Sequence, residues 1–169
     1  MRRLRLAATG RAAVATIGRV EDDRPDPLAL EEQICFGLAV AARSVVAAYG
    51  AVLQPLGLTH PQYLVMLALW QHDRASITDL ARLLHLEPGT VSPLVRRLEH
   101  AGLVERTRST RDQRALEVSL TPRGVGLRRE ALAVPEQMLA RLGMSVEDLT
   151  RANALLRAII GAAEASPDG

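Results

Sequence analysis

Cysteine is nearly absent from the sequence, because Cys35 is the single thiol among 169 residues. One cysteine cannot form a disulfide within the chain or a cysteine-rich zinc site. The histidines also lack the spacing of metal ligands, so we expect no metal and no other cofactor. The four histidines are His60, His72, His85 and His100.

Aromatic residues are also scarce, since the chain has one phenylalanine, two tyrosines and one tryptophan. They are Phe36, Tyr49, Tyr63 and Trp70. Hydrophobic residues nevertheless make up 48% of the sequence, so the core must be aliphatic and rich in alanine. This composition favours packed helices over a β-sandwich, with Tyr63 and Trp70 expected in the core.

Long apolar runs are missing as well. No run approaches the ~20 residues that a membrane span needs, and the first residues lack the continuous apolar stretch of a signal peptide. We therefore expect a cytoplasmic protein without a membrane partner. The length fits one domain, or one domain with an appendage.

Lysine is absent, and all 21 basic side chains are arginine. The overall net charge is only +2, but its distribution is uneven. Residues 96–128 carry eight arginines against four acidic residues, and residues 1–24 carry six against three. A local excess of positive charge is what contact with nucleic acid requires.

The first half of the chain shows helical periodicity. Asp26 as N-cap and Pro27 at the first helical position predict a helix over 27–53. Thr59 caps a second predicted helix that runs to about His72. Residues 1–25 show no sustained period, and we interpret them as a disordered basic tail. This tail could touch DNA, or it could have no role in the fold.

A helix-turn-helix is predicted next. Ser76 and Asp79 form a capping-box-like pair that opens a helix over 77–85, and Pro88 opens another that Gly102 ends. Apolar residues recur in the second helix at the spacing of one helical face. These apolar positions are Val91, Leu94, Val95 and Leu98.

After Gly102 the apolar period changes from about 3.6 to 2, which predicts a two-stranded wing. The strands are 103–106 and 116–120, and a further helix is expected from Thr121-Pro122 to about Leu142. Ser145 begins a last helix that ends near Ala163.

The predicted fold is mainly α with a small β-wing: a winged helix-turn-helix plus a helical dimerisation region. The domains we expect are a tail at 1–25, a dimerisation helix at 26–58, a DNA-binding domain at 59–121, dimerisation helices at 122–164 and a flexible tail at 165–169.

Candidate DNA-binding residues gather on the second helix of this motif. Short groups near its N-terminus could meet base edges, and arginines beyond them could hold phosphates. The first set is Thr90, Ser92 and Pro93, and the second is Arg96 and Arg97.

The wing adds a second set of candidates, because arginines inserted into a narrow minor groove meet an enhanced negative potential. These arginines are Arg106, Arg108, Arg111 and Arg114, and Asp112 could orient Arg114 through a bidentate pair. The alternative is a winged helix that binds another protein.

Several segments resemble MarR-type winged-helix repressors. They are Ser76-Ile-Thr-Asp-Leu-Ala-Arg-Leu-Leu, Gly89-Thr-Val-Ser-Pro-Leu-Val-Arg-Arg-Leu-Glu, Gly102-Leu-Val and Asp112-Gln-Arg-Ala-Leu-Glu-Val-Ser-Leu-Thr-Pro-Arg-Gly. A narrower resemblance is to OhrR, the branch that senses organic hydroperoxides. It rests on Gln33-Ile-Cys-Phe, Tyr49, Leu58-Thr-His-Pro-Gln-Tyr-Leu-Val-Met-Leu and Gly89-Thr-Val-Ser-Pro. The resemblance covers residues 29–140. It implies a homodimer on a pseudo-palindromic double-stranded DNA operator, with Arg114 in the minor groove and Asp112 as its partner.

In the resembled branch, an organic hydroperoxide oxidises the single N-terminal cysteine. Tyrosines, including one from the other subunit, hold this cysteine in its reduced state. Tyr49 matches such a tyrosine. Cys35 and Tyr49 are fourteen residues apart, about 21 Å along a straight helix, so they cannot touch within one chain. A phenol from the second subunit could hydrogen-bond to the sulfur and favour the thiolate. Oxidation would yield a sulfenic acid, to be resolved by a low-molecular-weight thiol or over-oxidised.

The chain departs from the branch at two positions, where Ala39 and His60 replace tyrosines. His60 could take over a hydrogen bond or face solvent at a helix start. Tyr49, His60 and Tyr63 are the candidate residues that support the sensor. We expect a repressor and not an enzyme, and we keep two alternatives. Cys35 could be a structural thiol in a regulator that binds a small-molecule ligand, or the chain could be a thiol peroxidase.

Overall fold

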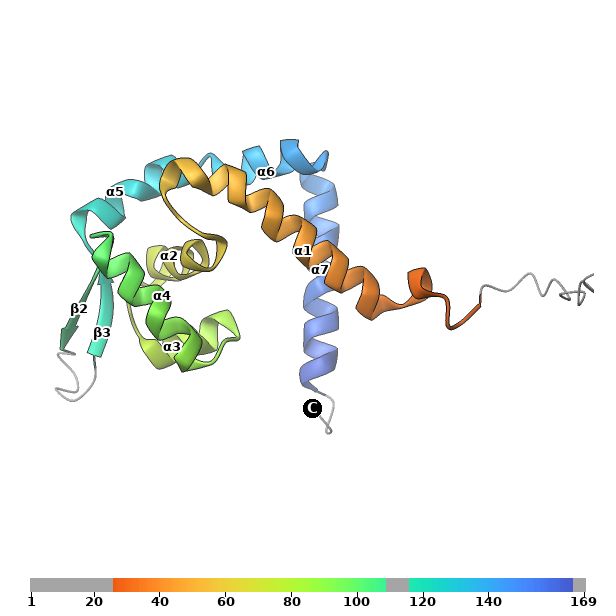
Figure 1. Cartoon of the computed structure of the whole chain (residues 1–169), viewed down its shortest axis with the longest axis horizontal. Coiled ribbons are helices and arrows are strands. Elements are labelled where there is room, and N and C mark those ends of the chain that lie inside the picture. The colour runs from red at the N-terminus through yellow and green to blue at the C-terminus, as the bar shows by residue number, and fades with distance from the viewer. Residues whose placement is uncertain (1–25, 109–115, 166–169) are drawn as a thin grey trace, which may run out of the picture. The chain divides into compact units, whose positions relative to one another are not determined.

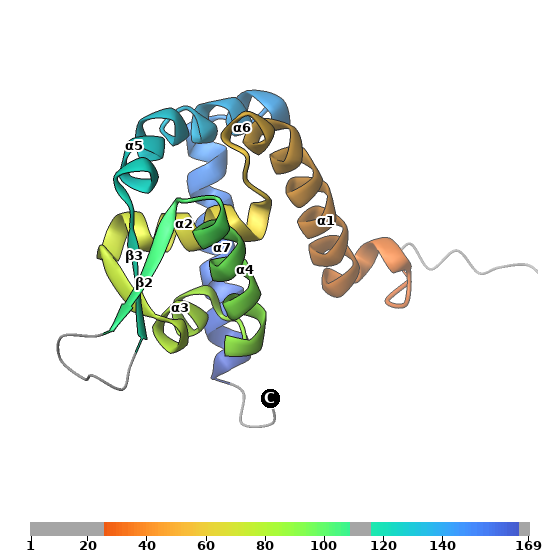
Figure 2. The same cartoon turned by 60° about the vertical axis from the view of Figure 1, so that its left-hand side comes forward.

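The computed structural model describes residues 26–108 and 116–165 (Figures 1 and 2). The predicted tail at 1–25 and most of the predicted tail at 165–169 lie outside the described residues. The chain divides after Leu38 into two units, and helix α1 (Ile34–Leu53) begins in the first and continues in the second.

The start of the first predicted helix was wrong. Asp26 forms a turn, in which its side chain accepts a hydrogen bond from the Leu28 N–H at 3.0 Å, and a 3₁₀ turn follows at Leu30–Glu32. Gln33 then has an extended backbone, with ψ of 119°, and separates this turn from α1. Its amide group donates hydrogen bonds to the carbonyls of Pro27 and Ala29. Asp26 therefore does accept a backbone hydrogen bond as an N-cap residue would, but it does so in a turn that is separate from α1.

The predicted helix-turn-helix is confirmed. After a short 3₁₀ turn at Gln54–Leu56, the chain forms α2 (His60–His72), α3 (Ile77–Leu84) and α4 (Pro88–His100). The Gln62 side chain accepts a hydrogen bond from the Thr59 N–H at 2.9 Å at the start of α2. The Ser76 hydroxyl accepts one from the Asp79 N–H at 3.0 Å at the start of α3.

The sheet has three strands where the sequence predicted two. β2 (Val104–Arg108) and β3 (Leu116–Leu120) form the predicted hairpin, and β1 (Arg74–Ser76) pairs with the other edge of β3. All pairs are antiparallel, with Ala75 and Arg106 both opposite Val118. β1 was missed because three residues between two helices are too few to show a period of 2.

The single helix predicted from 122 to 142 is two helices, α5 (Pro122–Ala131) and α6 (Val134–Leu142). Pro135 explains the break, because it lacks an N–H and its ring would collide with the carbonyl four residues earlier in a continuous helix. The last helix, α7 (Val146–Glu164), begins after Ser145 as expected.

The core of the second unit is aliphatic, as the composition predicted. The largest completely buried side chains include Leu53, Met66, Leu69, Leu80 and Leu98. Tyr63 is buried and Trp70 is partly buried against the same cluster, which confirms both as core residues. The Trp70 indole donates a hydrogen bond to the Gly124 carbonyl at 3.0 Å and so joins α2 to α5.

The statement that no apolar run reaches the length of a membrane span was wrong. Residues 34–56 are long enough and apolar enough, with a mean hydropathy of 1.7, although no membrane is implied by length and composition alone. This segment contains Arg43, and most of its side chains are exposed. Most of its apolar side chains are therefore left uncovered by the residues that the structure describes.

Candidate nucleic-acid interface and cysteine site

Helix α4 presents a polar face because its apolar residues are all turned inward. Val91, Leu94, Val95 and Leu98 are buried, as their spacing predicted. The predicted DNA-contacting residues occupy the other side of the helix: Thr90, Pro93, Arg96 and Arg97 are exposed, and Ser92 is partly buried. The structure thus brings the five residues that the sequence assigned to this helix onto one accessible surface.

Helix α4 is held in place from both ends. Its first turn follows the α3–α4 connection, where His85 ends α3 in a left-handed conformation with φ of 51°. Beyond its C-terminus, Gly102 has φ of 68°, and the Thr121 hydroxyl donates a hydrogen bond to the Gly102 carbonyl at 2.7 Å. The Arg123 side chain donates another to the Ala101 carbonyl. The turn between α4 and β2 is therefore fixed by the start of α5.

The wing is described only in its strands. Arg108 is exposed at the end of β2, whereas Arg111, Asp112 and Arg114 lie outside the described residues. The predicted pairing of Asp112 with Arg114 accordingly stays a prediction.

Arg106 of the wing is bound to a carboxylate. Its Nε and Nη2 atoms both donate to Oε2 of Glu99 on α4, at 2.9 and 2.5 Å. The hydrogen bond from Arg106 holds the pKa of Glu99 below its usual value. The sequence grouped Arg106 with the residues that surround the wing turn and did not reveal this partner.

Cys35 lies in the first turn of α1, and its side chain is exposed in the single chain. It belongs to the first unit, whereas Tyr49 belongs to the second. Both are on α1, so the fourteen-residue separation on which the cross-subunit argument rests falls within one helix. Exposure leaves the thiol open to an oxidant in the absence of a partner.

The structure brings together the three residues that were predicted to support the sensor. The Tyr49 ring centre lies 5.1 Å from that of His60 and 6.0 Å from that of Tyr63. Burial raises the pKa of Tyr49 and of Tyr63 and lowers the pKa of His60. Neutral forms are thus favoured for all three, and their hydroxyl and imidazole groups can take part in hydrogen bonds.

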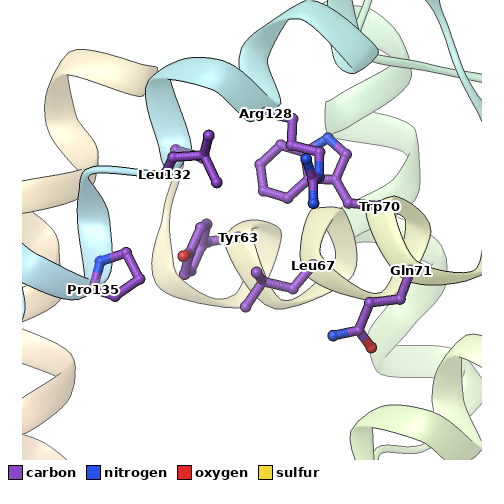
Figure 3. A pocket seen from close by; sticks show the side chains of 8 residues that line it. Tyr63, Leu67, Trp70, Gln71, Arg128, Leu132 and Pro135 are labelled. Carbon is purple, nitrogen blue, oxygen red and sulfur yellow. The ribbon is translucent and has the colours of Figure 1, made fainter. Parts of the chain in front are cut away.

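A pocket between α2 and α5 was not found from the sequence (Figure 3). It has a volume of about 170 Å³, and Figure 3 shows Tyr63 and Leu67 of α2 facing Leu132, the residue that follows α5. Trp70 and Arg128 line the same space. The apolar face of α2 is visible in the sequence, but the position of Arg128 depends on how α5 packs, which no local pattern reveals.

Comparisons with known proteins assign this architecture. Residues 58–116 match the model of the MarR family. The organic hydroperoxide resistance transcriptional regulator of Bacillus subtilis is 34% identical over 139 residues, which span 82% of this chain and 95% of that protein.

Two solved structures have a similar fold. AbfR, in its reduced form bound to DNA, has a TM-score of 0.69 and 28% identity, over 80% of this chain and 92% of that one. BpsR of Bordetella bronchiseptica, whose DNA binding is regulated by 6-hydroxynicotinic acid, has a TM-score of 0.71 and 26% identity. This match covers 79% of this chain and 97% of that one. The exposed helix α4, the adjoining hairpin and these likenesses agree, and the chain belongs to the MarR family of winged-helix transcriptional regulators.

Proposed function

We propose that this chain is a DNA-binding repressor that leaves its operator when an organic hydroperoxide oxidises Cys35. The DNA-binding part is carried by one observation, the accessible polar and basic face of α4 beside the β2–β3 hairpin. A helix of this kind fits the major groove, with short side chains toward base edges and arginines toward phosphates.

The DNA contacts can be tested with arginine substitutions. Arg96→Ala or Arg97→Ala should weaken binding to any DNA sequence. Each should also make the negative slope of log K against log salt shallower by about 1, since each removes one phosphate contact. Arg141→Ala on α6 is the matched control, because it removes the same charge from an exposed position outside the helix-turn-helix and outside the proposed dimer contacts of α1 and α7. Equal binding by all three variants and the parent would contradict the proposed surface.

A homodimer is part of the proposal. Helix α7 carries a series of large apolar side chains that the single chain leaves exposed, and α1 carries another. They are Val146, Leu149, Leu155, Leu156 and Ile160 on α7, and Ile34, Phe36, Val40 and Val46 on α1. A second copy would cover these side chains and place two α4 helices on the two halves of a palindromic site. In our proposal, contact with the second copy also accounts for the apolar character of residues 34–56.

The oxidation proposed for Cys35 needs only its own sulfur, the hydroperoxide and a proton. The thiolate sulfur attacks one oxygen of the hydroperoxide, the O–O bond breaks, and the other oxygen leaves and takes a proton to become an alcohol. Cys35 becomes a sulfenic acid. A low-molecular-weight thiol can then displace water to form a mixed disulfide, or further hydroperoxide can over-oxidise the sulfur.

The exposure of Cys35 and the likeness to a hydroperoxide-resistance regulator support this assignment. Tyr49 and His60 of the second subunit are the proposed hydrogen-bonding partners of the sulfur. Oxidation would add polar bulk where the two subunits meet and change the spacing of the two α4 helices.

A second candidate function is regulation by a bound small molecule, and the pocket between α2 and α5 favours it. A dry cavity of ~150 Å³ is large enough to hold one benzene ring, and this pocket is slightly larger. Trp70 and Tyr63 supply aromatic walls, and Arg128 could pair with a carboxylate. BpsR, which responds to an aromatic carboxylic acid, is a structural relative. In that case Cys35 would be a structural thiol.

The two candidates predict different behaviour of the Cys35→Ser variant. An oxidation sensor loses its response to hydroperoxide with this change, whereas a ligand-responsive regulator keeps its response to the ligand and loses it with Arg128→Ala. A thiol peroxidase, the third alternative, would turn over hydroperoxide repeatedly in the presence of a thiol. The curated relative is named a transcriptional regulator, which favours a single switching event.

A further inference from the structure

We propose that Glu99 and Arg106 form a brace that holds the wing at a fixed position relative to helix α4, so that both elements meet DNA together. This inference rests on the proposed DNA binding. It assigns Arg106 a positioning role in place of the DNA contact that its location in the wing suggests.

The geometry of the brace is specific. Two guanidinium nitrogens of Arg106 converge on one carboxylate oxygen of Glu99, at 2.9 and 2.5 Å. The two side chains are only 34% and 31% exposed, less than those of the ion pairs Arg82–Asp79 and Arg151–Asp148 on other helices. Charge-assisted hydrogen bonds to a partly desolvated pair are stronger than those of a fully solvated one.

The brace also joins two different elements at a point beyond the turn that connects them. Arg82–Asp79 and Arg151–Asp148 each lie within a single helix, whereas Glu99–Arg106 links α4 to the middle of β2. Leu103 and Val104 are buried and anchor the base of the hairpin. Beyond them, Glu105 to Arg108 are exposed, so β2 projects away from the core.

The position of Arg106 on β2 determines what the brace controls. Side chains two residues apart on a strand lie on the same face, so Arg106 and Arg108 share one side of β2. Fixing Arg106 to α4 therefore fixes the direction in which Arg108 leaves the strand. For both elements to meet DNA together, the distance between α4 and Arg108 must match the distance from the major to the minor groove.

Repulsion of phosphates and positioning of the wing predict opposite effects of the loss of Glu99 on the affinity for DNA. An acidic side chain on a DNA-facing helix repels phosphates, so its removal by charge alone should tighten binding. If Glu99 instead positions the wing, its removal should weaken binding although the protein becomes more positive. The hydrogen bond that lowers the pKa of Glu99 agrees with a carboxylate held in its charged form by Arg106.

The experiment compares full-length variants on DNA that the parent protein selects from a random-sequence pool. Glu99→Ala should weaken binding about three- to tenfold. Glu105→Ala is the control, because it removes the same charge from β2, next to Arg106, and leaves the brace intact. It should bind as well as the parent or better. The single changes E99R and R106E should each weaken DNA binding. The double variant E99R/R106E, which exchanges the two charges, should recover most of the lost affinity, which a role in folding alone would not produce. Thermal melts of each variant confirm that it is folded.

Three outcomes are distinguishable. Weaker binding by Glu99→Ala with recovery in the exchange supports the brace. Binding by Glu99→Ala that is equal to or tighter than that of the parent overturns the brace and leaves DNA binding standing, as does an exchange without recovery. A parent protein that selects no DNA overturns the proposed function itself.

Discussion

Gly124 in α5 lies against the backbone of the turn that follows α4. A Cβ atom at this position would come within 2.0 Å of the Leu103 carbonyl oxygen, which is a backbone atom that cannot turn aside. The same glycine carbonyl accepts the hydrogen bond from Trp70. One residue thus allows α2, α5 and the base of the wing to meet.

Gly124→Ala should therefore destabilise the protein by about 1–3 kcal/mol or more, as overpacking does, and lower Tm by about 2 to 4 °C per kcal/mol. Gly126→Ala, on the same helix, is the control. Nothing lies within 4 Å of its Cβ position, so the gain in helix propensity should leave Tm unchanged or slightly higher. Equal melting temperatures for the two variants would contradict the close packing at Gly124.

His60 gives a prediction about pH. Burial lowers its pKa in the folded state, so the unfolded chain binds a proton more readily than the folded chain does. The stabilisation from neutral His60 is complete above the unfolded pKa of about 6.5. It is lost as the pH falls through the lower pKa of the folded state.

His60→Gln should remove this part of the pH dependence, so the difference in Tm between pH 8 and pH 5, about one and a half units either side of the unfolded pKa, should be smaller in the variant. His72→Gln is the control, since His72 is exposed. Parallel Tm curves for the parent and both variants would show that His60 is not held neutral by burial.

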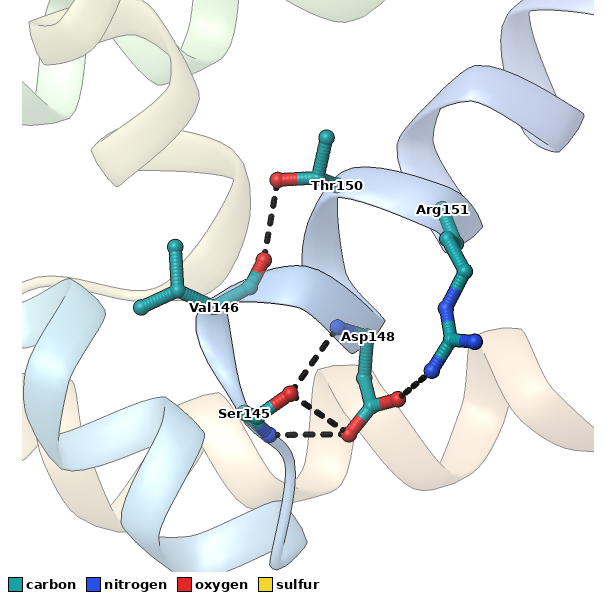
Figure 4. A network of polar contacts seen from close by, with 5 residues as sticks. All are labelled: Ser145, Val146, Asp148, Thr150 and Arg151. Carbon is teal, nitrogen blue, oxygen red and sulfur yellow. Dashed lines mark hydrogen bonds and ion pairs between the residues drawn. The ribbon is translucent and has the colours of Figure 1, made fainter.

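At the scale of single elements, the start of α7 shows how a local pattern specifies a helix (Figure 4). Asp148 Oδ2 accepts hydrogen bonds from the Ser145 N–H at 3.0 Å and from the Ser145 hydroxyl at 2.8 Å. The Asp148 N–H in turn donates to the Ser145 hydroxyl at 3.1 Å. The backbone N–H groups of Ser145 and Asp148 thus both have an acceptor in this capping box. Arg151 pairs with the other carboxylate oxygen of Asp148.

Ser145→Ala should lower Tm by about 2 to 4 °C, because it leaves the Asp148 N–H without its acceptor. Thr150→Ala is the control on the same helix. Its hydroxyl only donates to the Val146 carbonyl at 2.9 Å, an interaction that helices do not need. A smaller effect of Ser145→Ala than of Thr150→Ala would contradict the importance of the cap.

Elements with such caps were predictable from the sequence, and elements that depend on distant partners were not. Thr59, Ser76 and Ser145 precede α2, α3 and α7 as their patterns indicated. Strand β1 exists only because β3 lies beside it, and its three residues carry no signal of their own. The break before α6 was signalled by Pro135, but the apolar period continues across it and concealed the end of α5.

At the scale of the whole molecule, helix α4 was predictable, because the helical spacing of its apolar residues determines both its buried face and its exposed face. The partner of Arg106 was not, since Glu99 is seven residues away on another element, and neither was the pocket at Arg128. Both depend on the packing of helices against the hairpin or against each other. In our proposal, Cys35 and Tyr49 meet across a second subunit, which the structure of a single chain does not include.

The central claim is that oxidation of one thiol controls DNA binding. The most direct measurement is a mobility-shift titration with cumene hydroperoxide, in the presence of a low-molecular-weight thiol, that compares the parent with Cys35→Ser on the same selected DNA. The parent should release the DNA as the hydroperoxide concentration rises, and Cys35→Ser should stay bound throughout. Equal release by both proteins would contradict the account.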